Sequence, residues 1–495
     1  MGEEREDNPQ GAVTKFNVGS FSRNVIIYSA GQVLLFVIGA IQGLIVPKFL
    51  SIVDYGYFQM FALYSSYAGL LHLGFTDGAL VRWASGGKEI ISRELKPAFI
   101  FYSMQLMAVI LPLVIICSFI LHAQNQFIAL SVLAYAFVYD FGFLFIFAAQ
   151  AVRNFKLIAL VNIIRSVIVF AAIIFILATG HNFYNLVILA LICGQLIFSI
   201  IMVLQYRKYL MTKVSEISIN SMWQQAKLNF RIGIFILLGN LIIVLYTTFD
   251  RLIINTFFSV EQFAIYSFAM SIVLIAYIFV SAVSQVFFPY LARVGTELRV
   301  KAYQLGKPSI IIIWCCILAA YYPAVWLINL YLPQYTESIA ILKILLCTVV
   351  FGGLIQILHV NYYMSFQRQK KYFLFALASL AVLAILIVLT LVLNRTLQNV
   401  ALATLVGFGV WYFVNEIYLN NMLGFGYKPM LKDLFLIVII LIIFTGSSLV
   451  SASIIVQLLV YLVVVAAVVF VFLRKEIIEL VSVVNFIRRE KRNYG

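Results

Sequence analysis

Apolar runs of 18 to 28 residues recur along the whole chain, separated by short polar segments. A helix needs about 20 mostly apolar residues to cross roughly 30 Å of hydrocarbon, so each run predicts a membrane-spanning helix. The runs lack the alternation of a transmembrane strand, which argues against a β-barrel. The pattern therefore predicts an all-α polytopic membrane protein with about fourteen spans, at 24–46, 57–76, 97–121, 126–150, 157–179, 184–205, 231–256, 262–289, 308–331, 338–365, 372–393, 398–422, 433–450 and 452–473.

Composition and charge agree with this topology. The 495 residues are 64% hydrophobic and 11% charged, which excludes a water-soluble globule. The net charge is +15, and 29 of the 34 Lys and Arg residues fall in alternate loops and the two termini. Only Lys48 and Arg395 lie in the opposite loops. By the positive-inside rule both termini are cytoplasmic. The excess of basic residues thus reflects the membrane topology of the chain, and we expect no nucleic-acid partner.

The predicted spans divide the chain into two lobes. A shift of 208 residues aligns 48–58 with 256–266, placing Gly56 on Ala264, and an even number of spans between the copies makes this a parallel repeat. The predicted order is a cytoplasmic tail at 1–22, an N-lobe at 23–205, a cytoplasmic inter-lobe loop at 206–230, a C-lobe at 231–422, two further spans within 423–473, and a cytoplasmic amphipathic tail at 474–495. Duplicated halves with a site between them are typical of transporters.

Four stretches carry a resemblance to a known family: NVIIYSAGQVLLFVIGAIQGLIVPKFLSIVDYGYF, LHLGFTDGALVRWAS, TTFDRLIINTFFSVEQFAIYSFAMSI and VFFPYLARV. In these and in span order the chain resembles the polysaccharide exporters, the Wzx-type O-antigen flippases of the multidrug/oligosaccharidyl-lipid/polysaccharide superfamily. The resemblance implies a bacterial inner-membrane flippase for an undecaprenyl-pyrophosphate-linked glycan in lipopolysaccharide or related polysaccharide biosynthesis. It also implies a polysaccharide polymerase and a chain-length regulator as partners. Asp77 and Arg82 match the family's LGF...R stretch and are expected at a cytoplasmic gate or loop anchor.

Six ionisable residues lie inside predicted spans, where a charge costs roughly 2.5–3.5 kcal/mol at mid-membrane. They are Asp140, Arg165, Asp250, Arg251, Lys343 and Glu416. Asp140 and Arg165 have matching predicted depths and can pair. Two interpretations stay open: a structural ion pair, or a phosphate-binding Arg165 beside a protonatable Asp140.

A polar stripe is predicted along span 231–256, where Asn240, Thr247 and Arg251 share one helical face. With Lys343 at similar depth, the stripe predicts a cationic central cavity for the pyrophosphate. Alternatively, Lys343 and Lys48 extend to the lipid headgroups. Asp250 points away from Arg251 and is a candidate for helix packing.

No cofactor is expected, since no phosphate-binding loop motif occurs and the four His residues lack metal-ligand spacing. Coupling to H⁺ or Na⁺ stays open, with Asp140, Asp250 and Glu416, near a cytoplasmic vestibule, as the candidate carboxylates. Two alternatives to a flippase are a multidrug cation antiporter of the same superfamily and a lipid-linked-sugar polymerase or ligase. An antiporter would place an unpaired acid deep in the first lobe. An enzyme would need catalytic outer loops, and the predicted ones are short, so no enzymatic activity is expected.

Overall fold

The computed structural model describes residues 37–493 except 153, 181–182, 212–218 and 294. The predicted tail at 1–22 and most of the first predicted span lie outside these residues. Every regular element in the described part is a helix, which confirms the all-α fold class. Twelve helical stretches there are long and apolar enough to cross a membrane, and they coincide with twelve of the fourteen predicted spans.

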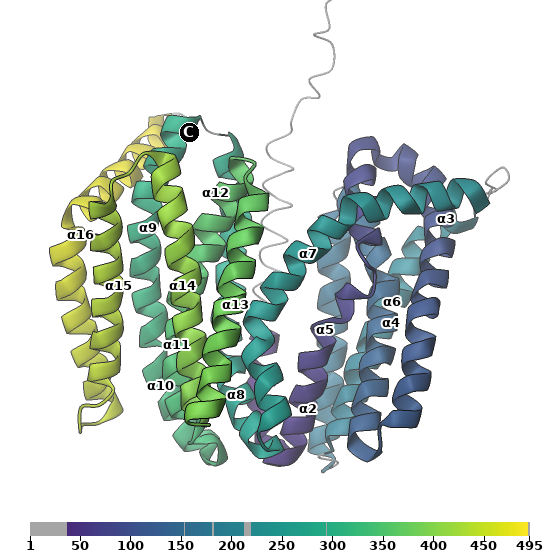
Figure 1. The fold of residues 1–495 in the computed structure, drawn as a ribbon, viewed down its shortest axis with the longest axis horizontal. Helices are drawn as coiled ribbons and strands as arrows, with labels where there is room; N and C mark the ends of the chain where they lie inside the picture. The colour runs from purple at the N-terminus through teal and green to yellow at the C-terminus, as the bar shows by residue number, and fades with distance from the viewer. Residues whose placement is uncertain (1–36, 153, 181–182, 212–218, 294, 494–495) are drawn as a thin grey trace, which may run out of the picture.

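The first half contains a short helix at 37–49, then α2 (Ile52–Ser65), η1 (Ala68–Leu70), α3 (Phe75–Ile120), α4 (Ala123–Ala151), α5 (Phe155–Ala178) and α6 (Tyr184–Met211). The second half contains α7 (Ile219–Phe257), α8 (Val260–Arg293), α9 (Thr296–Ala319), α10 (Tyr321–Tyr331), η2 (Pro333–Tyr335), α11 (Ser338–Leu354), the π-helical turn η3 (Ile355–His359), α12 (Val360–Ser365), α13 (Gln369–Leu393) and α14 (Leu397–Leu423). The pair α15 (Tyr427–Ser447) and α16 (Ile454–Asn493) packs beside α9 and α10, at the far edge from the first half (Figure 1).

The span predicted at 57–76 is not one helix. The chain passes from α2 through η1 to α3, and the break falls at Leu73 and Gly74, with φ of 50° and 85°. A second break at Gly87, with φ of 62°, lets α3 reverse its direction, so that the predicted loop after the span is also helical. Glycine tolerates such left-handed backbone. An apolar run does not reveal these breaks, because both sides of each break are helical.

The helix α7 links the two lobes. Residues 219–230, assigned to the inter-lobe loop from the sequence, are helical and continuous with the rest of α7. This first part packs on α3, where Ala226 and Phe230 join the core of the N-lobe. A Cβ on Gly233 would lie 1.8 Å from the backbone oxygen of Gly74, so the helices are in backbone contact there. In Figure 1, α7 then bends and descends to the end of the molecule where α2 and α8 meet.

Two N-caps recur at the offset of the predicted internal repeat. The Ser51 hydroxyl accepts a hydrogen bond from the Asp54 N–H at the start of α2, and the Ser259 hydroxyl accepts one from the Gln262 N–H at the start of α8. The two helices begin at Ile52 and Val260, which is the 208-residue offset seen in the sequence. Each serine satisfies a helix N-terminus in the same way, since a side-chain oxygen there replaces the missing intrahelical acceptor.

Candidate transport site

The two repeat copies pack against each other at the predicted outer end of the membrane. A Cβ on Gly56 of α2 would lie 3.5 Å from the Cβ of Ala264 and 2.8 Å from the backbone oxygen of Val260 in α8. Tyr55 packs edge-on against Tyr335, with ring centroids 5.5 Å apart. We call the contact of α2 with α8 and η2 the outer junction. The small residue at position 56 allows this close approach.

Polar contacts reinforce the outer junction. The Lys48 ammonium donates to the Tyr331 carbonyl at 2.7 Å, and Gln334 donates to the Pro47 carbonyl at 3.1 Å. From the sequence, Lys48 could face either the lipid headgroups or the cavity. In the structure it connects the two lobes at the outer junction. The hydroxyls of Tyr67 and Thr248 also share a hydrogen bond between the lobes, and the Asn255 side chain donates to the Tyr64 hydroxyl at 2.7 Å.

Arg251 is buried beside the outer junction rather than exposed in a cavity, with 6% of its surface accessible. The Arg251 Nε has no hydrogen-bond partner. Tyr55 and Tyr67 of the N-lobe lie close enough to interact electrostatically with the guanidinium. Asp250 accepts from the Tyr266 hydroxyl at 2.5 Å and from the Arg251 backbone N–H at 2.7 Å, so it packs helices together.

The other members of the predicted stripe have different surroundings. Asn240 is exposed, and the Thr247 hydroxyl bonds to carbonyls of its own helix, including that of Ile243 at 3.1 Å. Lys343 is half-buried on α11. Of the three predicted cations, Arg165 lies on α5, Arg251 near the end of α7 and Lys343 on α11.

Asp140 and Arg165 do not form the predicted pair. The Arg165 guanidinium donates to the Gln195 side chain at 2.7 Å and lies over the Phe198 ring. Asp140 has no accessible surface, and neither carboxylate oxygen has a hydrogen-bond partner. Gln195 of the neighbouring α6 accepts the hydrogen bond that Arg165 was expected to give to Asp140. The matching depths of Asp140 and Arg165 in the sequence did not reveal this partner.

The residues of the matching LGF...R stretch lie at the joint of α3 and α7. Asp77 is buried, with an oxygen 3.7 Å from the His72 Nε2. Arg82 donates to Asn229 of α7 at 2.8 Å and pairs with Glu94, which also accepts from the Trp83 indole. Arg82 thus anchors the first part of α7 to the N-lobe.

Glu416 does not face a vestibule. It is fully buried and accepts from Lys307, from the Tyr303 hydroxyl at 2.8 Å and from His359 at 3.0 Å. Lys307 also donates to Asp433 of α15 at 2.8 Å, so this network joins α9, η3, α14 and α15. The sequence placed Lys307 in a cytoplasmic loop, because the apolar run begins at Pro308; the structure buries it in α9.

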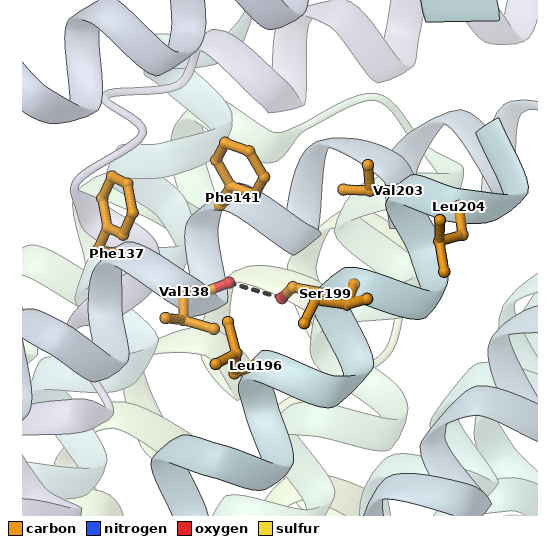
Figure 2. Close-up of a pocket in the computed structure, with 8 residues that line it drawn as sticks. Phe137, Val138, Phe141, Leu196, Ser199, Val203 and Leu204 are labelled. Atoms are coloured by element: carbon orange, nitrogen blue, oxygen red, sulfur yellow. Dashed lines mark hydrogen bonds between the residues drawn. The ribbon is translucent and has the colours of Figure 1, made fainter. Parts of the chain in front are cut away.

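An apolar pocket of about 260 Å³ lies between α4 and α6. Figure 2 shows its lining, with the hydroxyl of Ser199 donating to the backbone carbonyl of Val138 at 2.7 Å. The remaining lining residues are Phe137, Phe141, Leu196, Ile200, Val203 and Leu204. Because its one polar side chain already has a partner, this pocket does not suit a glycan or a phosphate. Within the described residues, no group of three or more His, Cys, Asp or Glu side chains is placed to hold a metal ion.

Comparisons with known proteins agree with this architecture. No curated protein matches the chain. Among solved structures, the lipid II flippase MurJ in an inward closed conformation superposes with a TM-score of 0.69 at 14% identity, covering 91% of this chain and 100% of that one. An inward-facing multidrug resistance transporter of the MATE family superposes with a TM-score of 0.60 at 15% identity, covering 81% and 98%.

At these identities the similarity shows the fold alone. The family itself comes from the sequence: the model of the polysaccharide biosynthesis proteins matches residues 21–294, more than half of the chain. The chain therefore belongs to the polysaccharide biosynthesis protein family, in agreement with its resemblance to the Wzx-type flippases.

Proposed function

We propose that this chain is a flippase that moves an undecaprenyl-pyrophosphate-linked oligosaccharide, an O-antigen or related repeat unit, from the inner to the outer leaflet of the bacterial inner membrane. The observation that carries the proposal is the family match over residues 21–294 on a two-lobed transporter fold. The polysaccharide polymerase and chain-length regulator belong to the proposal as partners.

The outer junction supports alternating access. In the proposed cycle, lobes joined at the predicted outer end correspond to an inward-facing state, in which the glycan enters from the cytoplasmic side. Separation of Gly56 from Val260 and Ala264 then opens the outer end. The inside-negative potential drives the anionic pyrophosphate outward by about 2.3 kcal/mol per charge per 100 mV, so the cycle needs no nucleotide.

Arg251 is the cation best placed to meet the pyrophosphate as the outer junction opens. Its side chain is packed between the lobes in the closed state, and opening of the junction frees it for a phosphate. Lys343 on α11 would act as a second contact, and Arg165 as a contact on the N-lobe.

Loss of Arg251 tests this role. We expect Arg251→Ala to lower export of the lipid-linked glycan in cells by roughly tenfold to a hundredfold, the range for a lost hydrogen bond to a charged group. Lys343→Ala should act in the same direction. Arg395→Ala is the control, because Arg395 is an exposed cation at the same predicted end, over the Phe258 ring. Normal export by the Arg251→Ala/Lys343→Ala double variant at normal membrane abundance would contradict the cationic path.

One observation favours the antiporter alternative. The unpartnered Asp140 is the acid in the first lobe that a cation antiporter would require, and the sequence had assigned it a partner. The family match favours the glycan nonetheless. A polymerase or ligase is disfavoured, because described outer connections such as 258–259 and 394–396 have only two and three residues.

A further inference from the structure

Four aromatic side chains follow one another along one face of α4. Tyr135, Tyr139, Phe143 and Phe147 are spaced four residues apart, and their consecutive ring centroids are 5.9, 5.1 and 4.6 Å apart. The first two pairs are stacked, with interplanar angles of 21° and 26°. Because residues at i and i+4 share a helical face, the rings form a continuous row about 18 Å long along the helix axis. We call this row the aromatic ladder.

The chain segment from α2 to η1 packs along one side of the aromatic ladder. Phe61 of α2 lies edge-on to Tyr135, with ring centroids 5.7 Å apart. His72, after η1, stacks on Phe143 at 6.2 Å with an interplanar angle of 8°. These contacts fix the orientation of the rings, yet Tyr135, Tyr139 and Phe143 are only half-buried. The ladder is therefore a preformed surface, and part of three of its rings is accessible.

Polar groups accompany the ladder in the middle of the membrane. Tyr139 lies next to the midpoint of the predicted span 126–150. Within the described residues, neither the Tyr135 nor the Tyr139 hydroxyl has a hydrogen-bond partner. Arg165 of α5 is half-buried and close enough to interact electrostatically with both tyrosines. Hydrocarbon at this depth would leave such groups unsatisfied at a large energetic cost. The accessible side of the ladder therefore suits water or a polar ligand rather than lipid.

A carbohydrate has the chemistry that this surface requires. The C–H groups on one face of a pyranose ring are weakly positive, and the face of an aromatic ring carries the negative side of its quadrupole. A sugar stacked on the ladder keeps its hydroxyls at the rim, within reach of the tyrosine hydroxyls. Arg165 uses one N–H group of its guanidinium for Gln195, and the guanidinium has further donors for oxygens of a ligand. Consecutive rings are about 6 Å apart along the helix, close to the length of one pyranose unit in a chain.

We propose that the aromatic ladder binds the oligosaccharide of the substrate, with sugars stacked on Tyr135, Tyr139 and Phe143 and the pyrophosphate beside them at Arg165. The proposal rests on the proposed flippase function and adds that the N-lobe recognises the carbohydrate itself. Stacking requires a ring face made of C–H groups. The ladder therefore selects glycans built from pyranoses whose hydroxyls are mostly equatorial.

Binding of two lipids to the purified full chain in detergent tests the ladder. One is the undecaprenyl-pyrophosphate-linked oligosaccharide extracted from the source cells, and the other is sugar-free undecaprenyl pyrophosphate. We expect Tyr135→Leu/Tyr139→Leu to weaken binding of the glycolipid by about tenfold to hundredfold, the range for two lost aromatic contacts, and to leave binding of the sugar-free lipid unchanged. Tyr135→Phe/Tyr139→Phe retains both rings and should keep most of the affinity for the glycolipid.

The matched control is Phe137→Leu/Phe141→Leu. These two aromatic residues are also four apart on α4, but they line the apolar pocket on the opposite face of the helix (Figure 2). Their replacement should leave the affinity for both lipids unchanged. If the double tyrosine variant unfolds, Phe143→Leu provides the second measurement, with an expected loss of about twofold to tenfold for the glycolipid alone.

An unchanged affinity for the glycolipid in the leucine variants of the ladder would overturn the proposal. An equal loss of both lipids in folded protein would also overturn it, because the rings would then support the lobe or the pyrophosphate rather than the sugars. A wild-type chain that binds neither lipid would contradict the proposed function itself. The two kinds of failure are therefore distinguishable.

Discussion

Oxidation of a Gly56→Cys/Ala264→Cys variant is expected to stop glycan transport completely, and reduction is expected to restore it. The Cβ built at position 56 lies 3.5 Å from that of Ala264, within the 3.5–4.5 Å range of disulfides, and 2.8 Å from the Val260 backbone oxygen, so α2 must shift slightly from α8 to admit the new side chain. A bond there fixes the outer junction closed, so a bound glycan cannot leave toward the outer leaflet. Transport is measured before oxidation, after a membrane-permeant oxidant, and after reductant, in a background with the five native cysteines replaced.

The control is a cross-link that stays within one lobe. The Cβ built on Gly194 of α6 lies 3.6 Å from that of Val169 on α5, so Val169→Cys/Gly194→Cys offers nearly the same geometry inside the N-lobe. We expect this bond to leave most of the transport intact. A fully cross-linked Gly56→Cys/Ala264→Cys protein that transports at the uncross-linked rate would show that the outer junction does not open during the cycle.

The second large effect is expected from Lys307. Lys307→Met removes the ammonium from the buried Glu416 and the half-buried Asp433, and should destabilise the protein by about 3–5 kcal/mol, the usual loss when one partner of a buried pair is deleted. Thermal unfolding in detergent should show a large fall in Tm. Adding Glu416→Gln should recover part of the loss, because only Asp433 then stays unpaired.

Lys432→Ala is the matched control. Its pairing with Glu476 joins α15 to α16 with 39% and 26% of the side chains exposed, where an ion pair contributes about 0–1 kcal/mol. Equal destabilisation by Lys307→Met and Lys432→Ala would contradict the assignment of the Lys307 network as the link that holds α15 to the C-lobe.

The fold follows from sequence wherever it depends on apolar length alone. Span positions from 97 to 473 depend on runs of about 20 apolar residues, and the described helices agree with them. The prediction for 57–96 was wrong in detail. Left-handed backbone at Gly74 and at Gly87 breaks the helix there, and hydropathy does not report φ. The helical character of 219–230 was missed because hydropathy does not mark it: Ala226 and Phe230 pack on the N-lobe core, while most of the polar residues are exposed.

For the candidate site, the sequence identified individual charged residues but not the contacts between them. Asp140, Asp250, Arg251 and Glu416 stand out as charges in apolar runs, and the structure buries all four. The partners of Glu416 were not recognised, because Lys307 and His359 lie on α9 and η3. Lys307, His359 and Asp433 surround Glu416, which only the tertiary packing reveals. A Lys directly before a Pro at the start of an apolar run was the one available signal, and it was interpreted as a loop.

The most direct test of the flippase function is reconstitution of the purified chain into liposomes with an undecaprenyl-pyrophosphate-linked oligosaccharide in the inner leaflet and an inside-negative potential. Glycan that reaches the outer leaflet is counted with a membrane-impermeant lectin. We expect the wild-type chain to expose the glycan far faster than empty liposomes, and the oxidised Gly56→Cys/Ala264→Cys chain to match empty liposomes. Glycan exposure no faster than in empty liposomes, from a chain that exchanges multidrug cations for protons, would contradict the flippase function.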